Sequence, residues 1–288
     1  MIPASFAYHA PQSVAEAVSL LEQHGDEAKI LAGGHSLLPA LKLRLSQPGV
    51  LIDISRIGEL QGIHVGSSIE IGAGATYAAV AGHAGVRSGC AVLAECVEQI
   101  GDIQVRNRGT VGGALAHADP AADLPAVLLA LGGSVSAQGP GGSRTIAADD
   151  LFVEMLTTAL EPNEVVTKVT VPALGKGEGA AYSKLKHPAS RYAIVGVAAY
   201  VKLAADGSVA AARIAVTGAG PKAERQSAAE AALVGSAGDD AAVAAAAAAA
   251  GDDMEYLGDI HASEDYRRAM VKVYTRRAVA AALSRARA

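Results

Sequence analysis

The chain has 288 residues, of which 51% are apolar and 18% charged, and its formal net charge is −5. This length and apolar content predict two domains with a substantial buried core. The acidic balance, without any dense basic run, argues against nucleic-acid binding. No signal peptide is evident, and no apolar run is long enough to span a bilayer. The sequence therefore predicts a soluble, cytoplasmic protein without a transmembrane segment.

The N-terminal 54 residues alternate between strand-like and helix-like patterns. Ser13 is a candidate N-cap with Glu16 three positions on, which is the spacing of a capping box. Pro39 is compatible with a helix in its first turn. The expected order is strand, helix, strand, helix and strand, with the last four elements at 14–24, 28–32, 36–45 and 50–54.

From residue 60 onward the pattern mixes hairpins with short helices. Alternating side chains predict one hairpin at 62–71, and a Gly-Pro-Gly-Gly turn predicts a second between strands at 135–137 and 143–146. The β-branched run at 165–171 predicts a strand that ends at Pro172. Helices are expected at 77–84, 91–100 and 123–131.

The glycine-rich segment 175–179 is the best candidate for a domain boundary. Strands follow at 180–185, 193–203 and 210–217, and Asp206-Gly207 makes the turn between the last two. The alanine-rich run 241–250 favours a helix over disorder, because alanine is the best helix former. The last helix, 264–284, has a basic side that we interpret as solvated or facing another subunit, with Arg267, Arg268, Lys272, Arg276 and Arg277.

The cysteine and histidine content predicts no metal site. The two cysteines, Cys90 and Cys96, fit a reducing compartment and cannot supply the four ligands of an iron–sulfur cluster. Both fall on apolar helix patterns and are expected to be buried thiols. His117 and Asp119 resemble a pair of metal ligands, but no cluster elsewhere in the sequence completes the set.

Two glycine pairs about eighty positions apart are the most informative feature. The first lies in Ala32-Gly33-Gly34-His35-Ser36-Leu37, and the second opens the segment from Thr110-Val111-Gly112-Gly113 to Asp123. Paired glycines allow positive φ and a close approach of the backbone to a ligand. Successive free N–H groups in such turns form an anion site. Two such sites predict the binding of one long anionic ligand, a dinucleotide with a pyrophosphate.

Two further glycine segments imitate a Rossmann fingerprint. The segment 72–77 ends in Tyr77, where close helix–strand packing requires glycine or alanine. The segment 218–223 contains Pro221 and has no βαβ continuation. We therefore predict no Rossmann site, and we interpret 72–77 as a turn beside the cofactor with Thr76 as a cofactor contact.

Asp123 and Tyr192 each allow two interpretations. Asp123 opens a predicted helix, so it is either the N-cap of that helix or an acceptor for ligand hydroxyl or ring N–H groups. Tyr192 stands just before an apolar strand, where it either packs at the strand end or stacks on a ligand ring.

These motifs resemble the flavoprotein medium subunit of the molybdenum hydroxylases, the family of xanthine dehydrogenase and aerobic carbon monoxide dehydrogenase. The resemblance rests on the Ala-Gly-Gly-His-Ser and Thr-Val-Gly-Gly…Asp-Pro-Ala-Ala-Asp segments and extends over essentially the whole chain. It includes the start at 3–8 and the segment 258–268. The sequence of the second segment is most similar to the carbon monoxide dehydrogenase branch.

The resemblance implies an α+β fold. Residues 1–176 would form a two-part FAD-binding domain of the vanillyl-alcohol-oxidase type, split near 57, and 177–288 a smaller α+β domain with a three-stranded sheet and helices. FAD would lie between them without a covalent bond. The implied cofactor contacts are Ala32, Gly33, Gly34, His35, Ser36, Leu37, Thr110, Gly112 and Gly113 for the pyrophosphate, Ala116, His117 and Asp123 for the ribityl or flavin region, and Lys186 and Tyr192 for the isoalloxazine.

The resemblance also implies the chain's part in an oxidoreductase complex. A large partner with a molybdenum cofactor would oxidise the substrate, and a small partner with two 2Fe–2S clusters would pass the electrons to FAD here. An external acceptor would then receive them, and the assembly would be a dimer of heterotrimers. No acid–base catalyst is expected in this chain, because its part is to position and tune the flavin.

Two other functions are compatible with the same motifs. A self-contained flavin oxidase or dehydrogenase would need catalytic groups in its second domain, and the residues after the boundary offer few. A cofactor-free assembly module would gain nothing from the flexible glycine pairs.

Overall fold

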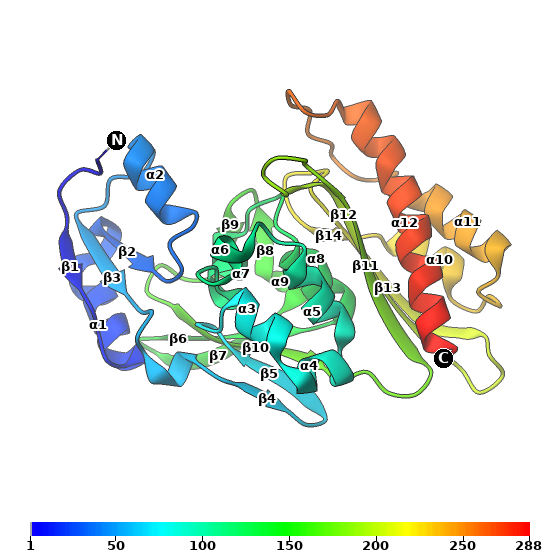
Figure 1. Ribbon diagram of the computed structural model, residues 1–288, viewed down its shortest axis with the longest axis horizontal. Coiled ribbons are helices and arrows are strands. Elements are labelled where there is room, and N and C mark those ends of the chain that lie inside the picture. The colour runs from blue at the N-terminus through cyan, green and yellow to red at the C-terminus, as the bar shows by residue number, and fades with distance from the viewer. Residues whose placement is uncertain (1) are drawn as a thin grey trace.

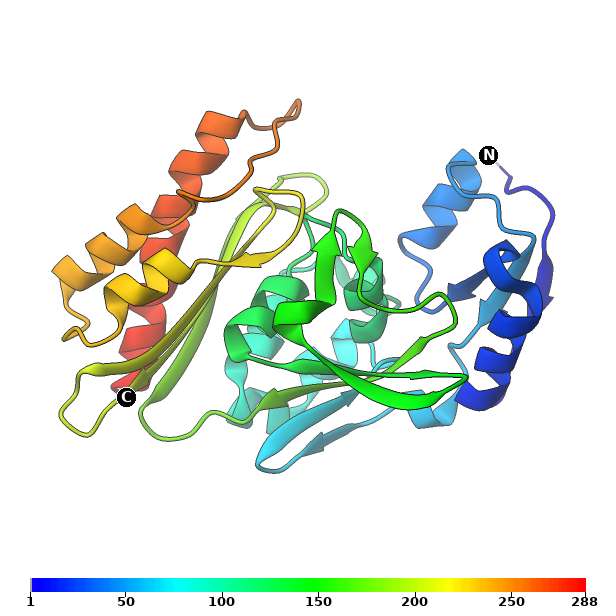
Figure 2. The ribbon, with the colours of Figure 1, turned by 180° about the vertical axis from the view of Figure 1, so that it is seen from behind.

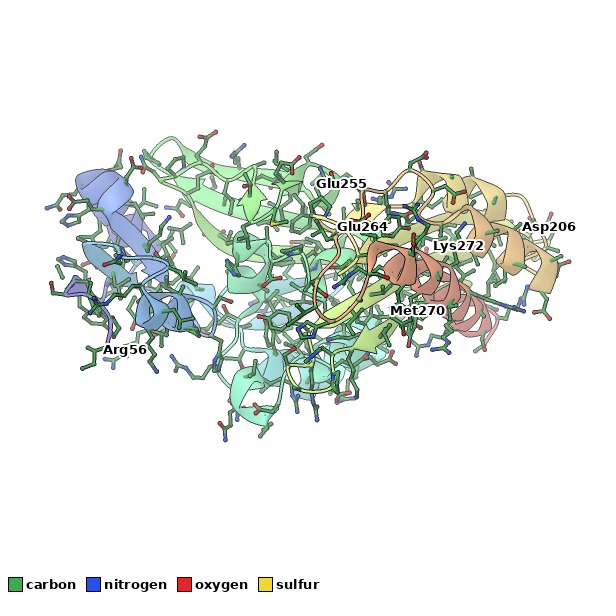
Figure 3. The ribbon with its side chains drawn as sticks, turned by 90° about the horizontal axis from the view of Figure 1, so that it is seen from above. Arg56, Asp206, Glu255, Glu264, Met270 and Lys272 are labelled. Atoms are coloured by element: carbon green, nitrogen blue, oxygen red, sulfur yellow. The ribbon has the colours of Figure 1, made fainter. Side chains whose placement is uncertain are left out.

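The computed structural model describes residues 2–288, and three bodies lie in a row along its long axis (Figure 1). We call them the N-terminal body (residues 2–57), the central body (58–174) and the C-terminal body (178–288). Figure 3 shows Arg56 near one end of this row and Asp206 at the opposite end. No helix within residues 2–288 is long and apolar enough to cross a membrane.

The N-terminal body is a small parallel sheet with helices at its side. Strands β1 (Ala7–His9), β3 (Val50–Asp53) and β2 (Ala28–Leu31) lie in that order, and the helices are α1 (Val14–His24), α2 (Leu37–Leu43) and the 3₁₀ turn η1 (Gly25–Glu27). The Ser13 hydroxyl accepts from the Glu16 N–H and starts α1, as the spacing predicted. The buried face of α1 is apolar and consists of Val14, Ala17, Val18 and Leu21.

The central body is an antiparallel sheet with helices packed above it. Its strands lie in the order β4 (Ile63–Val65), β5 (Ser68–Gly72), β10 (Val165–Pro172), β6 (Ser134–Gly139) and β7 (Gly142–Ala147). The helices are α3 (Tyr77–Gly82), α4 (Ala84–Gly89), α5 (Ala91–Glu98), α6 (Ile103–Arg106), α7 (Val111–His117) and α8 (Leu124–Leu131). Short elements complete it: η2 (Gly58–Leu60), α9 (Ala148–Leu151), β8 (Phe152–Glu154) and β9 (Thr157–Thr158).

The C-terminal body is an antiparallel sheet between two helical layers. Its strands lie in the order β11 (Glu178–Lys186), β12 (Ala193–Leu203), β13 (Val209–Thr217) and β14 (Glu224–Arg225). The sheet therefore has four strands, and the prediction of three missed β14. That strand has only two residues and no recognisable alternation. Helix α8 of the central body packs on one face, and α10 (Ser227–Leu233), α11 (Asp240–Ala249) and α12 (Glu264–Ala286) lie on the side away from it (Figures 1 and 2).

Strand alternation places neighbouring residues of this sheet in different cores. Tyr182 and Ala198 join the core of the central body, whereas Ala181 and Val197 join the core beneath α12. The sheet is thus buried on both faces. Arg267 is also buried, and its guanidinium donates to the carbonyl oxygens of Ile194 and Gly218 and to the Asp259 carboxylate. The interpretation of Arg267 as part of a solvated helix side was therefore wrong.

Candidate cofactor site

The first glycine pair lies in the turn between β2 and α2. Gly34 has φ +82°, a conformation that favours glycine, and a Cβ on Gly33 would collide with the carbonyl oxygen of Arg108. Within residues 2–288, the backbone N–H groups of Gly33, Gly34, His35 and Ser36 have no protein acceptor. These unpaired donors follow one another along the chain, which is the arrangement of N–H groups that suits an anion.

The second glycine pair differs from the prediction, because it lies in the first turn of α7 and not in an open turn. The Thr110 hydroxyl caps the helix by accepting from the Gly113 N–H at 3.2 Å, and the Gly112 N–H donates to the Ala73 carbonyl at 2.9 Å. Neither amide is free. A Cβ on Gly112 would overlap Ala73, so this glycine allows close packing rather than an unusual φ.

A cavity of about 530 Å³ opens between the two glycine segments. Residues 32–37 contribute to its lining, and so do Thr110, Gly112, Gly113, Ala116 and His117. The volume is within the range of small-molecule and cofactor sites. The sequence did not indicate a further part of the cavity lining, which includes Lys29, Ile54, Leu160, Pro162, Val165 and Val166.

A second cavity of about 200 Å³ adjoins the first, because His35, Ser36 and His117 line both. Asp123 and Tyr192 line this smaller cavity, so the structure brings these two predicted residues together with the glycine segments. The sequence analysis missed Tyr77, which lines both cavities, and Arg191, which lines the smaller one. The position of Tyr77, directly after a glycine turn and at the start of a helix, was the available signal.

Asp123 is buried in a polar cluster between two bodies. Its carboxylate accepts from the Tyr182 hydroxyl and from the Lys184 ammonium at 2.8 Å, and the Lys184 side chain is completely buried. Burial raises the pKa of Asp123, although Lys184 and Tyr182 act in the opposite direction. The side chain makes no capping bond to α8, so the N-cap interpretation was wrong.

Tyr192 reaches the cleft from the loop between β11 and β12. Burial raises the pKa of its phenol, and the nearby Ser36 hydroxyl acts in the opposite direction. The side chain thus lines the smaller cavity together with His35 and Ser36 of the first glycine segment. Two predicted contacts are placed elsewhere: Thr76 caps α3 by accepting from the Ala79 N–H, and Lys186 is exposed; neither is among the residues that line the two cavities.

The cysteines are buried, as expected. Burial raises the pKa of Cys90 to about 12 and raises that of Cys96 well above its usual value. Thiols of this kind are structural rather than reactive. In the part of the chain that the structure describes, no three His, Cys, Asp or Glu side chains gather as metal ligands.

The residues present fit a dinucleotide. Four unpaired amide donors suit a pyrophosphate, the Ser36 hydroxyl adds a side-chain donor, and two adjoining cavities provide room on either side. The polar groups of the smaller cavity, the Asp123 carboxylate and the Tyr192 phenol, can bond to or stack on a ring system.

Comparison with known proteins agrees with this geometry. Residues 4–174 match the FAD binding domain in molybdopterin dehydrogenase, and residues 180–282 match the CO dehydrogenase flavoprotein C-terminal domain. The carbon monoxide dehydrogenase medium chain of Hydrogenophaga pseudoflava is 44% identical over 99% of both chains. Subunit alpha of the 6-hydroxypseudooxynicotine dehydrogenase complex of Paenarthrobacter nicotinovorans is 40% identical over 100% of this chain and 97% of that one.

Two solved structures have the same fold along the whole chain. The carbon monoxide dehydrogenase of Hydrogenophaga pseudoflava that lacks the Mo-pyranopterin moiety superposes with a TM-score of 0.96 at 46% identity and 99% coverage of both chains. Quinoline 2-oxidoreductase of Pseudomonas putida 86 superposes with a TM-score of 0.93 at 32% identity and full coverage of both. The chain therefore belongs to the family of FAD-binding medium subunits of the molybdenum hydroxylases, and FAD is its cofactor.

Proposed function

We propose that this chain carries electrons within a molybdenum hydroxylase complex of the carbon monoxide dehydrogenase type. It would receive them from iron–sulfur clusters of a small partner and pass them to an external acceptor. The observation that carries the proposal is the run of unpaired amides from Gly33 to Ser36, which opens into a cleft of two adjoining cavities. The flavin supplies the electron chemistry, and the chain binds and orients it.

We propose that the cofactor occupies both cavities. The amides from Gly33 to Ser36 would hold the pyrophosphate, with Thr110 and Gly113 on the opposite wall. The isoalloxazine would lie in the smaller cavity beside Asp123 and Tyr192, and the adenosine would occupy the larger cavity. This direction is supported by the lining of the smaller cavity, where the Asp123 carboxylate, the Arg191 guanidinium and the Tyr192 ring come together.

We further propose a division into a FAD-binding domain, residues 1–176, and a smaller domain, 177–288, with the first subdivided near 57. The partners would be a large subunit with the molybdenum cofactor and a small subunit with two 2Fe–2S clusters, in a dimer of heterotrimers. The relatives named medium chain or subunit support such an assembly. Cys90 and Cys96 are buried with raised pKa values, so the clusters would belong to the partner.

The test is an absorption spectrum of the complex purified through this chain, followed by acid precipitation. We expect flavin bands, FAD in the supernatant, and co-purifying chains that contain molybdenum and iron–sulfur clusters. Gly33→Val and Gly113→Val should lose the colour. Gly141→Val is the matched control, because its added side chain meets nothing within 4 Å. A folded but colourless wild-type complex would refute the proposal, and a coloured chain that turns over alone would favour a self-contained oxidase.

A further inference from the structure

The loop from Pro188 to Tyr192 joins β11 to β12 and forms one wall of the smaller cavity. Ser190, Arg191 and Tyr192 line that cavity directly. The loop itself is exposed and contributes no side chain to the apolar cores. Its shape must therefore come from polar contacts, and these converge on one side chain, His187.

The imidazole of His187 accepts hydrogen bonds from the loop that follows it. The backbone N–H groups of Ala189 and Ser190 donate to its Nδ1 at 3.3 and 3.1 Å, and the Ser190 hydroxyl lies 3.1 Å from the same atom. Backbone N–H groups can only donate, so Nδ1 is the acceptor and carries no proton. The His187 backbone closes the loop by donating to the Tyr192 carbonyl at 2.8 Å.

The loop holds a conformation that it would not adopt unaided. Arg191 has φ +61°, in the left-handed region that residues with a Cβ rarely occupy. Such a residue persists only where its surroundings over-determine it. Two hydrogen bonds hold Arg191 in this conformation. Its backbone N–H donates to the His187 carbonyl at 2.9 Å, and its guanidinium donates to the Gly101 carbonyl at 3.2 Å across the cavity.

A second loop of the C-terminal body packs against the His187 ring. The His261 ring meets it edge to face, with centroids 4.3 Å apart. The Asp259 carboxylate accepts from the His261 N–H at 2.8 Å and from the buried guanidinium of Arg267 at 2.6 Å. The position of His261 is thus tied to the core beneath α12.

We infer that His187 is a positioning residue for the flavin pocket: its unprotonated Nδ1 shapes the loop that places Arg191 and Tyr192 on the smaller cavity. The inference rests on the proposed function, because it takes that cavity as the flavin site. His187 is not among the residues that line the cavity, so its effect on the cofactor passes through the loop backbone.

Three substitutions in the intact complex separate the Nδ1 bonds from the bulk of the ring. In His187→Asn the amide oxygen occupies about the place of Nδ1, whereas in His187→Gln it reaches the place of Nε2; His187→Ala has no acceptor. We expect His187→Ala and His187→Gln to raise the FAD dissociation constant about tenfold, and His187→Asn to stay within about twofold of wild type. The visible circular dichroism of the flavin, which senses the Tyr192 ring, should change in the same two variants.

The outcomes are distinguishable. Equal FAD binding in wild type and His187→Ala, or equal losses in the Asn and Gln variants, would overturn the inference while the proposed function stands. A wild-type complex without FAD would overturn both. Melting temperatures of the three variants provide the control for folding, and we expect them to agree because the loop lies outside both cores.

Discussion

At the glycine end of the cleft, the wall near the two glycine pairs consists of backbone and small side chains, and its polar groups include the unpaired N–H groups from Gly33 to Ser36. At the other end, the polar groups include a buried carboxylate, Asp123, held by Lys184 and Tyr182 from a different body. The first end attracts an anion without burying any charge. The second requires two charges to leave water.

This difference has a structural consequence. Fixed amide dipoles need only the correct backbone path, so the glycine end is complete within the N-terminal and central bodies. A buried ion pair is favourable only when both partners are present and well placed. Because Lys184 and Tyr182 stand on β11, the Asp123 end is complete only when the C-terminal body is docked.

Lys184→Met should have the largest effect on stability. It leaves the Asp123 carboxylate buried without its cation, and we expect the free energy of unfolding to fall by about 3–5 kcal/mol in a urea titration. Lys202→Met is the matched control, because Lys202 pairs with Glu178 but keeps half of its side chain in water. That variant should lose no more than about 1 kcal/mol.

The double variant Lys184→Met, Asp123→Asn makes this test specific to the pair. Asp123→Asn alone leaves Lys184 buried without an anion, whereas the double variant removes both charges. Its loss of unfolding free energy should therefore be smaller than the sum of the two single losses by about 0.5–3 kcal/mol. Strictly additive losses would show that Asp123 and Lys184 do not stabilise one another.

The effect of Lys184→Met should also depend on pH. Burial raises the folded-state pKa of Asp123 above its usual 3.8, and Lys184 opposes the rise. Removal of Lys184 raises this pKa further. A carboxyl with a raised folded-state pKa loses stability as the pH rises above the unfolded-state value. The difference in unfolding free energy between wild type and Lys184→Met should therefore grow between about pH 4 and pH 8; a constant difference would contradict this account.

Gly112→Val tests the packing role of the second glycine pair. The added side chain would overlap Ala73, so we expect the free energy of unfolding to fall by about 1–3 kcal/mol. Gly113→Ala is the control: its Cβ would meet only the Thr110 hydroxyl, at 2.7 Å, and the Ala32 Cβ, at 3.8 Å. Helix propensity favours alanine there, so its net change should lie within about 1 kcal/mol. Equal losses in both variants would argue against a packing role for Gly112.

The glycine end could be predicted from the sequence because its determinants are local. Gly33 and Gly34 follow a strand and precede a helix, and adjacency alone indicates a turn with free amides. The prediction was incomplete at Gly112 and Gly113, where the same residue pair starts a helix. Thr110 three positions before Gly113 was the signal of an N-cap that would have identified α7.

The Asp123 end could not be predicted, because the residues that form it are far apart in the sequence. Tyr182 and Lys184 lie 59 and 61 positions from Asp123 and meet it only through the docking of β11. In the sequence, nothing distinguishes Lys184, which is buried, from Lys186, which is exposed two positions later near the end of the same predicted strand. The weak signal was spacing: Tyr182 and Lys184 stand two apart, so they share the strand face that is buried against the central body.

Thr110→Ala should have the smallest effect and sharpens the comparison of the two glycine pairs. The Thr110 hydroxyl accepts from the Gly113 N–H, so its loss should lower the free energy of unfolding by about 1 kcal/mol, and Thr110→Ser should restore it. The hydroxyl keeps its own proton to donate into the cavity. The second segment thus offers one side-chain donor against four backbone donors in the first, and Thr110→Ala should weaken FAD binding by about tenfold at most. Tighter binding, measured by FAD titration, would instead show that the released Gly113 amide donates to the cofactor.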